Sequence, residues 1–410
     1  MKKLLLVLLI LSLFINHLNA NEKDLQIIQK DKKEYRLLDK ESIQTRQQSQ
    51  KYDWISPIDL SGNIGRNHSF SDENSRNLNN KNTKSASIGF TQSIFESGGI
   101  GFKMDYADNR FKYEMLSWEN QNSQLIYTIY NTLLDMKKLK LEINQNDYRI
   151  VNKDIELIIK KIQYEAGKTD IIELNNAIMS KNLILKEEIA LKNSLKEKEQ
   201  ELAKYTDLKY DEIEILDFQE TNKDIFLDKN YSILEADAKV EMLNSEYKIK
   251  KSQYLPKLSL SAKASYLNKD EKFNSMISDT NKDDATSSGS LILSMPLYDY
   301  TKSSKVQESK IEVLKQKALV NDLKNETAFE YEQIFTKIDT YLKQNETINK
   351  NIKLYEELIG ANKISSEAGM TSKYDLEILE NTKTINEFDI LINKINILQQ
   401  YAKLYFKIKN

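Results

Sequence analysis

Three long stretches of this chain contain neither glycine nor proline, and that absence most restricts its fold. They lie between Gly101 and Gly167, between Gly167 and Pro256, and between Pro296 and Gly360. Glycine and proline are the residues that interrupt helices, and Lys, Glu, Asn, Leu and Ile dominate the composition. We therefore predict long helices. As one helix, residues 102–165 would extend about 95 Å, which is longer than a compact domain needs.

Within 102–165, apolar side chains recur every seven residues in two series. The first is Ile129, Met136, Ile143, Ile150, Leu157 and Tyr164, and the second is Tyr127, Leu134, Leu141, Tyr148, Ile155 and Ile162. A strict seven-residue period indicates left-handed supercoiling. The series are offset by two residues, which places them about 200° apart around a helix. Two opposed apolar stripes suit a helix in a wall, with a neighbour on each side and polar faces between. A helix buried in a multilayer bundle would lose at least one polar face.

The chain also carries one unit twice. Residues 85–95 (SASIGFTQSIF) align with residues 288–298 (SGSLILSMPLY) at an offset of 203 residues. The tripeptide Glu-Ala-Gly occurs at 165–167 and again at 367–369, an offset of 202 residues. So small a slip over so long a segment indicates a duplicated strand–helix–turn–helix unit rather than a short solenoid repeat.

Four segments alternate apolar and polar residues with a period of two, which favours half-buried strands. Their apolar positions are Ile58, Leu60 and Ile64; Ala86, Ile88, Phe90 and Ile94; Leu258, Leu260, Ala262, Ala264 and Tyr266; and Leu291, Leu293, Met295 and Leu297. Each segment has about the ten residues that a tilted membrane-spanning strand requires. The polar connectors 71–83 and 268–286 are predicted to be exposed loops. The same pattern also fits two soluble hairpins packed on helices.

Four strands cannot close a membrane barrel, because open edges in hydrocarbon leave backbone groups unsatisfied. Several chains must therefore contribute. Two chains would give eight strands, whose side chains fill the interior, whereas three would give twelve strands and room for a water-filled lumen. The smallest assembly that makes a wide conduit is a homotrimer.

The first twenty residues predict a secretory signal peptide. Positive charge at Lys2 and Lys3 precedes an apolar run from Leu4 to Ile15, and Ala20 offers a small residue for cleavage. The run is short for a transmembrane anchor. No later apolar run approaches the length of a membrane-spanning helix, so any membrane entry by the rest of the chain must use strands.

Composition argues against an enzyme. The chain has no cysteine and two histidines, one of them in the leader, and it shows no glycine-rich phosphate loop. We predict no catalytic residue, no cofactor and no metal site. The net charge of -2 gives no indication of nucleic acid as a partner.

The sequence resembles the TolC-like outer membrane efflux protein family over nearly all of its length after the leader. The segments that carry the resemblance are the two glycine turns after long helices, TQSIFESGGI (91–100), QYLPKLSLSAKASY (253–266) and SGSLILSMPLYDYTKSSKV (288–306). The order, duplication and spacing of these segments are more specific than any one of them.

The resemblance implies a mostly helical fold with membrane β-structure. Each chain would supply four transmembrane strands and long coiled-coil hairpins to a trimeric 12-stranded β-barrel, continuous with an α-helical barrel. The protein would be a channel in the outer membrane of a Gram-negative-type envelope, extending into the periplasm and in contact with outer membrane lipid. It would serve as exit duct of a tripartite efflux or type I secretion system. Its partners would be a periplasmic adaptor (membrane fusion) protein and an inner-membrane pump of RND or ABC type.

Domain boundaries follow from these assignments. They are a signal peptide at 1–20, an N-terminal helical segment at 21–51 that is shorter than is usual in the family, a first membrane strand pair at 52–100, a first periplasmic hairpin at 101–204 with its tip near 165–173, an equatorial belt segment at 205–230, a helix into the second repeat at 231–255, a second strand pair at 256–300, and a second hairpin at 301–410 with its tip near 365–378.

The resemblance also implies roles for residues at the tips. The two turns would dock on the adaptor, through Glu165, Ala166 and Gly167 in the first and Glu367, Ala368 and Gly369 in the second. Glycine allows the left-handed conformation that ends a helix. Candidate gate residues are Asp375, Glu173, Asp170 and Tyr374.

Asp375 falls where the family has an acidic residue lining the constriction. The family's second acidic position corresponds to Ile378, which departs from the pattern and argues against a double acidic ring. Asp375 could equally be a solvated surface carboxylate, and Asp170 an ordinary residue at a helix N-terminus.

Two other classes of protein, a periplasmic adaptor and a structural coiled coil, also contain long helices. A periplasmic adaptor also carries long helical hairpins, but it flanks one hairpin with β-rich domains and does not repeat strand pair and hairpin twice. A structural secreted coiled coil would leave the four alternating segments unexplained. The sequence does not record the exported substrate or the class of pump, because a passive conduit takes its specificity from its partners.

Overall fold

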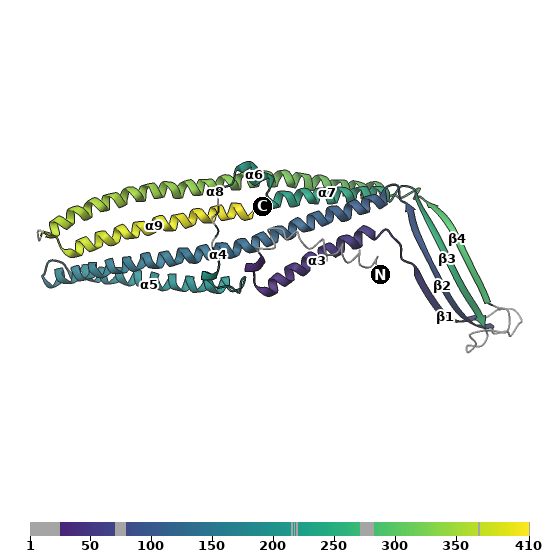
Figure 1. The fold of residues 1–410 in the computed structure, drawn as a ribbon, viewed down its shortest axis with the longest axis horizontal. Coiled ribbons are helices and arrows are strands. Elements are labelled where there is room, and N and C mark those ends of the chain that lie inside the picture. Colours follow the sequence, from purple (N-terminus) through teal and green to yellow (C-terminus); the bar gives the residue numbers. More distant parts are fainter. Residues whose placement is uncertain are drawn as a thin grey trace, which may run out of the picture. The chain divides into compact units, whose positions relative to one another are not determined.

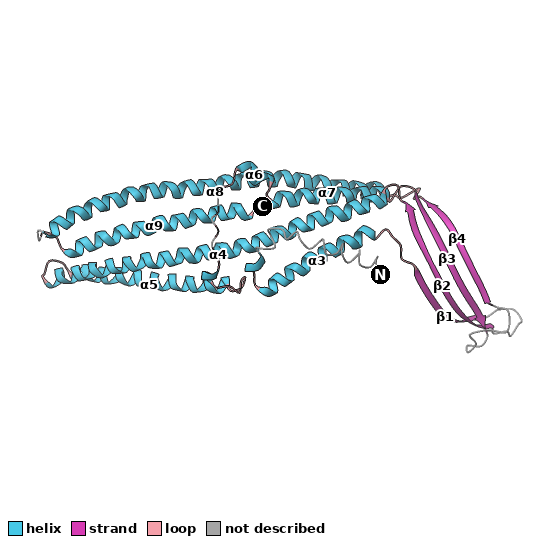
Figure 2. Ribbon diagram, in the orientation of Figure 1, coloured by secondary structure: helices cyan, strands magenta, loops and turns pink. Residues whose placement is uncertain are grey.

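The computed structural model describes residues 25–69, 79–214, 216, 218, 220–270, 283–367 and 370–409. The predicted signal peptide, much of the two predicted loops, and Ala368 and Gly369 of the second turn lie outside these residues. The described chain is predominantly helical with one small antiparallel sheet (Figure 1, Figure 2).

The helices and strands follow the predicted order. They are η1 (Leu25–Ile27), α3 (Lys30–Tyr52), β1 (Asp59–Ser69), β2 (Asn79–Phe95), α4 (Gly99–Glu165), α5 (Ile171–Leu202), η2 (Tyr210–Glu212), α6 (Lys223–Asp228), α7 (Tyr231–Ser252), β3 (Lys257–Asp270), β4 (Asp283–Ser294), α8 (Lys302–Glu367) and α9 (Lys373–Phe406). Among the described residues, no helix is both long and apolar enough to cross a membrane.

Contacts divide the chain into two compact units. The helical unit comprises 116–235, 321–410 and the described residues up to Lys40. The strand unit comprises 41–115 and 236–320, and it holds the whole sheet.

In the helical unit, α4 lies between α9 and α5 (Figure 1). On one side, Gln145 of α4 donates to Asp389 of α9 at 2.7 Å. On the other side, Arg149 of α4 pairs with Glu187 of α5 at 3.5 Å. Helix α8 continues the row beyond α9, and Asn393 of α9 donates to Asn345 of α8 at 2.9 Å. A neighbour on each side of α4 is what its two apolar stripes predict.

The two stripes are buried in the middle of α4 and exposed near its end. Ile129 and Met136 of the first stripe and Leu134 of the second are almost wholly buried. Towards the end of the helix, Ile162 and Tyr164 are exposed. The seven-residue period therefore marks packing surfaces along most of the helix, but not a closed core at its tip.

A compact core lies where α6, in the segment between α5 and α7, packs against α8 and the end of α9. We call Phe226 of α6, Ile334, Ile338, Leu404 and Ile408 the belt cluster. These side chains come from three separate parts of the sequence and are all buried. Nearby, Asn230 and Ile408 form an isolated antiparallel bridge, which ties the end of the chain to the belt segment.

The N-terminal helix α3 is held to α4 by a buried arginine. Within the helical unit, Arg36 donates to Asn122 at 2.6 Å and to the carbonyl of Trp118 at 2.9 Å. The Trp118 indole in turn donates to the carbonyl of Arg36 at 2.8 Å. Burial lowers the pKa of the Arg36 guanidinium, although nearby Asp39 opposes that shift. These contacts fix the packing of the short N-terminal segment.

The strand unit contains a four-stranded antiparallel sheet in the order β1-β2-β3-β4 (Figure 2). The predicted fourth strand is too long, because β4 ends at Ser294 and leaves Met295 and Leu297 outside it. Pro296, which has no N–H to donate to a strand ladder, explains this early end. Ile58 likewise lies just before β1. The other predicted apolar strand positions fall within the four strands.

Candidate functional site

The first hairpin turn is a complete helix-ending motif. Gly167 has a φ of +68°. Its N–H donates to the Tyr164 carbonyl at 2.9 Å, and the Lys168 N–H donates to the Gln163 carbonyl at 2.8 Å. This pair of hydrogen bonds around a left-handed glycine is the Schellman motif. Glu165 is the last residue of α4. All three residues of the predicted docking turn are exposed: Glu165, Ala166 and Gly167.

The second turn repeats part of this geometry. The Met370 N–H donates to the Ser365 carbonyl at 2.8 Å. This bond corresponds to the one from Lys168 to Gln163 in the first turn, because both of its residues lie 202 positions further along the chain. Glu367 is the last residue of α8 and is exposed. The repeat offset found in the sequence is therefore also an offset in hydrogen bonding.

Each tip continues into a capped helix. Asp170 is the N-cap of α5, and its Oδ1 accepts from the Glu173 N–H at 2.9 Å. Ser372 is the N-cap of α9, and its Oγ accepts from the Tyr374 N–H at 3.2 Å. Side-chain acceptors at this position satisfy N–H groups that have no partner within the helix. Asp170 thus has the local structural role that the sequence left open.

The two candidate gate carboxylates have different partners. Glu173 pairs with Lys160 of α4 at 3.0 Å, across the first hairpin. Asp375 accepts from the Ser372 N–H at 3.3 Å and so completes a capping box. Among the described residues, Asp375 makes no ion pair, and its side chain is exposed. The sequence signal for this box is a serine three residues before an acidic residue at a helix start, and it stands in Ser372-Lys373-Tyr374-Asp375.

The residues next to Asp375 at the start of α9 differ in exposure. Glu377 is exposed, whereas Tyr374 and Ile378 are half-buried. Lys373 lies with its ammonium 5.5 Å from the centre of the Tyr374 ring. The tip therefore presents Asp375 and Glu377 to solvent, one turn or less into α9.

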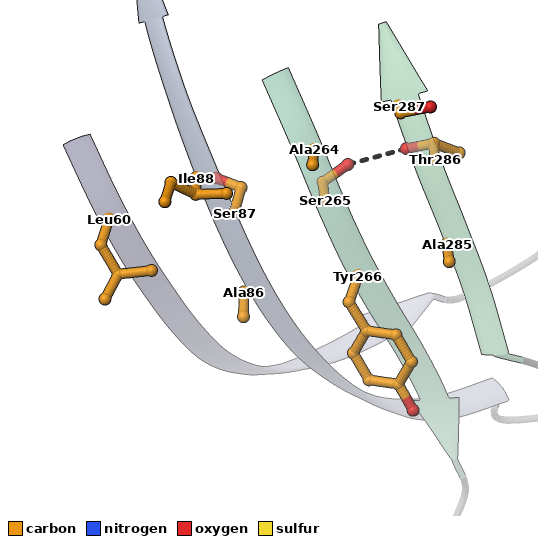
Figure 3. A pocket seen from close by; sticks show the side chains of 10 residues that line it. All are labelled: Leu60, Ala86, Ser87, Ile88, Ala264, Ser265, Tyr266, Ala285, Thr286 and Ser287. Atoms are coloured by element: carbon orange, nitrogen blue, oxygen red, sulfur yellow. Dashed lines mark hydrogen bonds between the residues drawn. The ribbon is translucent and has the colours of Figure 1, made fainter. Parts of the chain in front are cut away.

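The sheet is a second candidate surface because its two faces differ in chemistry. On one face, register partners Ser61, Ser87, Ser265 and Thr286 form a row of hydroxyls across all four strands. The hydroxyl oxygens of Ser61 and Ser87 lie 2.8 Å apart. Those of Ser265 and Thr286 are also 2.8 Å apart (Figure 3). The opposite face carries exposed apolar side chains, among them Leu60, Ile64, Ile88, Leu260, Tyr266, Leu291 and Leu293.

A shallow hollow of about 450 Å³ lies on the sheet (Figure 3). Small side chains form its floor and larger ones its rim: Ala86, Ala264 and Ala285, with Leu60, Ile88 and Tyr266. No charged side chain lines it. A continuous and exposed apolar face is unusual on a surface that meets only water.

Among the described residues, no group of three or more His, Cys, Asp or Glu side chains is placed to hold a metal ion.

A comparison with protein-family models matches residues 224–403 to the outer membrane efflux protein family. These residues include α7, the second strand pair, α8 and most of α9. No curated protein matches the chain in sequence.

Solved structures match nearly the whole chain in fold. The outer membrane protein VceC of Vibrio cholerae is 12% identical with a TM-score of 0.72, over 93% of this chain and 94% of VceC. The CmeC outer membrane channel of Campylobacter jejuni is 13% identical with a TM-score of 0.69, over 93% of this chain and 86% of CmeC. The MtrE outer membrane channel of Neisseria gonorrhoeae is 11% identical with a TM-score of 0.65, over 94% of this chain and 88% of MtrE.

These matches agree with the family that the sequence pattern indicated. By the family model over residues 224–403, and by fold over nearly the whole chain, this protein is similar to the TolC-like outer membrane efflux proteins.

Proposed function

We propose that this chain is the outer membrane exit duct of a tripartite efflux or type I secretion system. It resides in the outer membrane and extends into the periplasm. The duct is passive: a periplasmic adaptor docks on its hairpin tips and, with an inner-membrane pump, opens them. Neither the substrate nor the class of pump is part of the proposal.

The observation that carries this proposal is the two-faced sheet with unpaired edges. One face is apolar and exposed, and the other is lined by hydroxyls. Within the described strands, β1 pairs only with β2 and β4 pairs only with β3. In a membrane such edges require further strands, because unsatisfied backbone groups in hydrocarbon are costly. Lipid on the apolar face and water on the hydroxyl face account for the different chemistry of the two faces, and further strands from other copies account for the unpaired edges.

The ends of the helical row support assembly from several copies. Helix α5 exposes an apolar stripe at one end of the row, and α8 exposes apolar side chains at the other (Figure 1). On α5 the stripe is Ile172, Met179 and Leu183, at spacings of seven and four residues that share one helix face. We propose that α5 of one copy packs against α8 of the next. Three copies would close both a 12-stranded β-barrel and an α-helical barrel.

Within this duct, we propose that three copies of Asp375 form an acidic ring at the periplasmic entrance. The carboxylate is exposed and has no ion-pair partner among the described residues. Its hydrogen bond to the Ser372 N–H holds it at the start of α9 without neutralising its charge. Such a ring would favour cations and bind divalent ions.

The assembly can be tested by fractionating cell membranes and measuring the native mass of the detergent-solubilised protein. We expect outer membrane fractionation and a trimer of chains of about 45 kDa each after loss of the predicted leader. A protein that is monomeric in the periplasm without detergent would contradict the duct and favour an adaptor or scaffold.

The gate is tested separately, in single-channel recordings of Asp375→Asn. Asparagine retains an oxygen that can accept from the Ser372 N–H, so the helix cap is preserved while the charge is removed. We expect lower cation preference and weaker block by divalent ions. Glu377→Gln is the matched control, because it removes the same charge two residues along, about 200° around the helix. Equal effects of the two variants would contradict an Asp375 ring.

A further inference from the structure

The hydroxyl face of the sheet contains a row that differs from its neighbours. Asp59 on β1, Gly89 on β2, Lys263 on β3 and Ser288 on β4 are register partners. The adjacent row, from Ser61 to Thr286, carries only hydroxyls. A carboxylate and an ammonium therefore stand on either side of a glycine, in a surface that is otherwise mostly neutral around them.

Gly89 makes room for the lysine stem. A Cβ atom at Gly89 would lie 3.3 Å from Cβ and Cγ of Lys263, and 3.0 Å from the Ala262 carbonyl oxygen. The aliphatic part of Lys263 thus leans across β2, towards the strand that carries Asp59. Together Asp59, Gly89 and Lys263 line a hollow of about 430 Å³, whose remaining polar lining includes Ser61, Ser87 and Ser261.

Neither charge is neutralised nearby. Both side chains are exposed, and among the described residues neither makes an ion pair or a side-chain hydrogen bond. The backbones of register partners two strands apart lie about 10 Å from each other. Because Asp59 and Lys263 make no ion pair with any described residue and line the same hollow, each charge can act on a solute in it.

We propose that Asp59 and Lys263 form a charge-balanced ion site in the strand part of the conduit. Its ligands are small inorganic ions and the charged groups of exported solutes. Lys263 attracts anions and Asp59 attracts cations, and the two oppose each other, so that this part of the conduit discriminates little by charge. The inference rests on the proposed function, because it requires the hydroxyl face to line a water-filled lumen.

The test is the reversal potential in planar lipid bilayers under a KCl gradient. We expect Lys263→Gln to raise the ratio of potassium to chloride permeability about twofold or more, and Asp59→Asn to lower it by a similar factor. The double variant should return towards the wild-type ratio. Single variants that leave the ratio unchanged, or shift it in the same direction, would overturn the proposal.

Lys84 provides the matched control. It lies on β2 like Gly89, but its register partner on β1 is Ile64, so its side chain belongs to the apolar face. Lys84→Gln removes the same charge and should leave the permeability ratio unchanged. An equal shift from Lys84→Gln would show that charge anywhere on the sheet matters, and would overturn the site.

A second measurement uses the absence of cysteine from the chain. The Lys263→Cys variant should react with a charged, water-soluble thiol reagent and change its conductance, whereas the Leu60→Cys variant, changed on the apolar face, should not. If wild-type protein forms no channel, the duct itself is wrong and this site falls with it. If wild-type protein conducts and the 263 variants behave as wild type, only the site is wrong.

Discussion

At the belt, Phe226 and Leu404 are wholly buried, whereas at the tips Ile172, Ile364 and Met370 are exposed over more than half of their surface. The same two long helices, α8 and α9, run from the second tip to the belt cluster. Their ends differ because the belt cluster brings together buried side chains from α6, α8 and α9, whereas the described tip residues are held by turn and cap hydrogen bonds. One part of the helical unit is thus fixed by a core and the other by local hydrogen bonds.

This difference suits the proposed duct. Opening at the tips requires elements of low local stability, and those are regions with few buried apolar contacts. A fixed belt allows the tips to move without unfolding the helices behind them. Substitutions at the belt should therefore change global stability, whereas substitutions at the tips should change local opening.

The largest effect should come from Phe226→Ala. Its side chain has no exposed surface, so truncation leaves a cavity and should cost about 3–5 kcal/mol in the free energy of unfolding. Denaturant unfolding of the detergent-solubilised protein measures it. Ile225→Ala on the same helix is the control, because that side chain is about half exposed and should cost less than about 1 kcal/mol. Equal losses would mean that the belt cluster is not the fixed core.

The next effect concerns the charges that border the belt. Glu330 accepts from Lys407 at 2.6 Å and pairs with Lys403 at 2.8 Å. Burial alone would raise the pKa of the Glu330 carboxyl, but the two lysines outweigh it and leave the pKa below the ordinary value of 4.5. A carboxyl with a lowered folded pKa stabilises the fold above its unfolded pKa and loses that contribution as the pH falls through the folded value.

Glu330→Gln should therefore destabilise the protein by about 1–2 kcal/mol at neutral pH and by less in acid. Unfolding measured between pH 7 and pH 3 should show the wild-type and variant curves converging below about pH 4.5. Glu332→Gln, at a mostly exposed residue of the same helix, is the control. A constant difference across this range would exclude the ion pairs as the cause.

At the tips, Gly167→Ala should act locally. Its φ of +68° is costly for any residue with a Cβ atom, by about 1 kcal/mol. Hydrogen exchange of amides in residues 163–173 should become faster, while the belt keeps its protection. Gly360→Ala is the control with the opposite expected sign. Gly360 lies inside α8, and no atom lies within 4 Å of an added Cβ, so alanine should stabilise that helix by about 0.5–1 kcal/mol. Faster exchange at the belt in Gly167→Ala would remove the distinction between the two regions.

The tips and the belt also differ in how far the sequence predicts them. The turn at 165–167 follows from a single glycine at the end of a long helical stretch, and the flanking of α4 on both sides follows from its two stripes. The strands follow from alternation, apart from the end that Pro296 sets. These are local or periodic signals, which a sequence displays directly.

The belt and the anchoring of α3 could not be predicted in this way. Arg36 and Trp118 are 82 residues apart, and the belt cluster joins Phe226 to Leu404 across α8. No period or motif links such positions. The capping box at Ser372 and Asp375 is different, because it is local and its signature stands in the sequence.

The smallest expected effect on stability would be the most informative about the two tips. Lys160 is half-buried and Glu173 is exposed, so the pair is open to solvent, and breaking it with Lys160→Gln should change stability by only a few tenths of a kcal/mol. It would, however, leave Glu173 unpaired at the position that corresponds to Asp375 in the second repeat. If charge at the tips controls ion entry, Lys160→Gln should raise cation preference in single-channel recordings.

The neighbouring Lys161→Gln removes the same charge, but among the described residues Lys161 has no ion pair. If Lys160→Gln raises cation preference more than Lys161→Gln does, the pairing of Glu173 is what separates the first tip from the second. If the two variants behave alike, net charge near the tip is sufficient and the pairing has no special role. Because neither change touches the turn or the cap, this comparison tests the electrostatics of the tips without altering their fold.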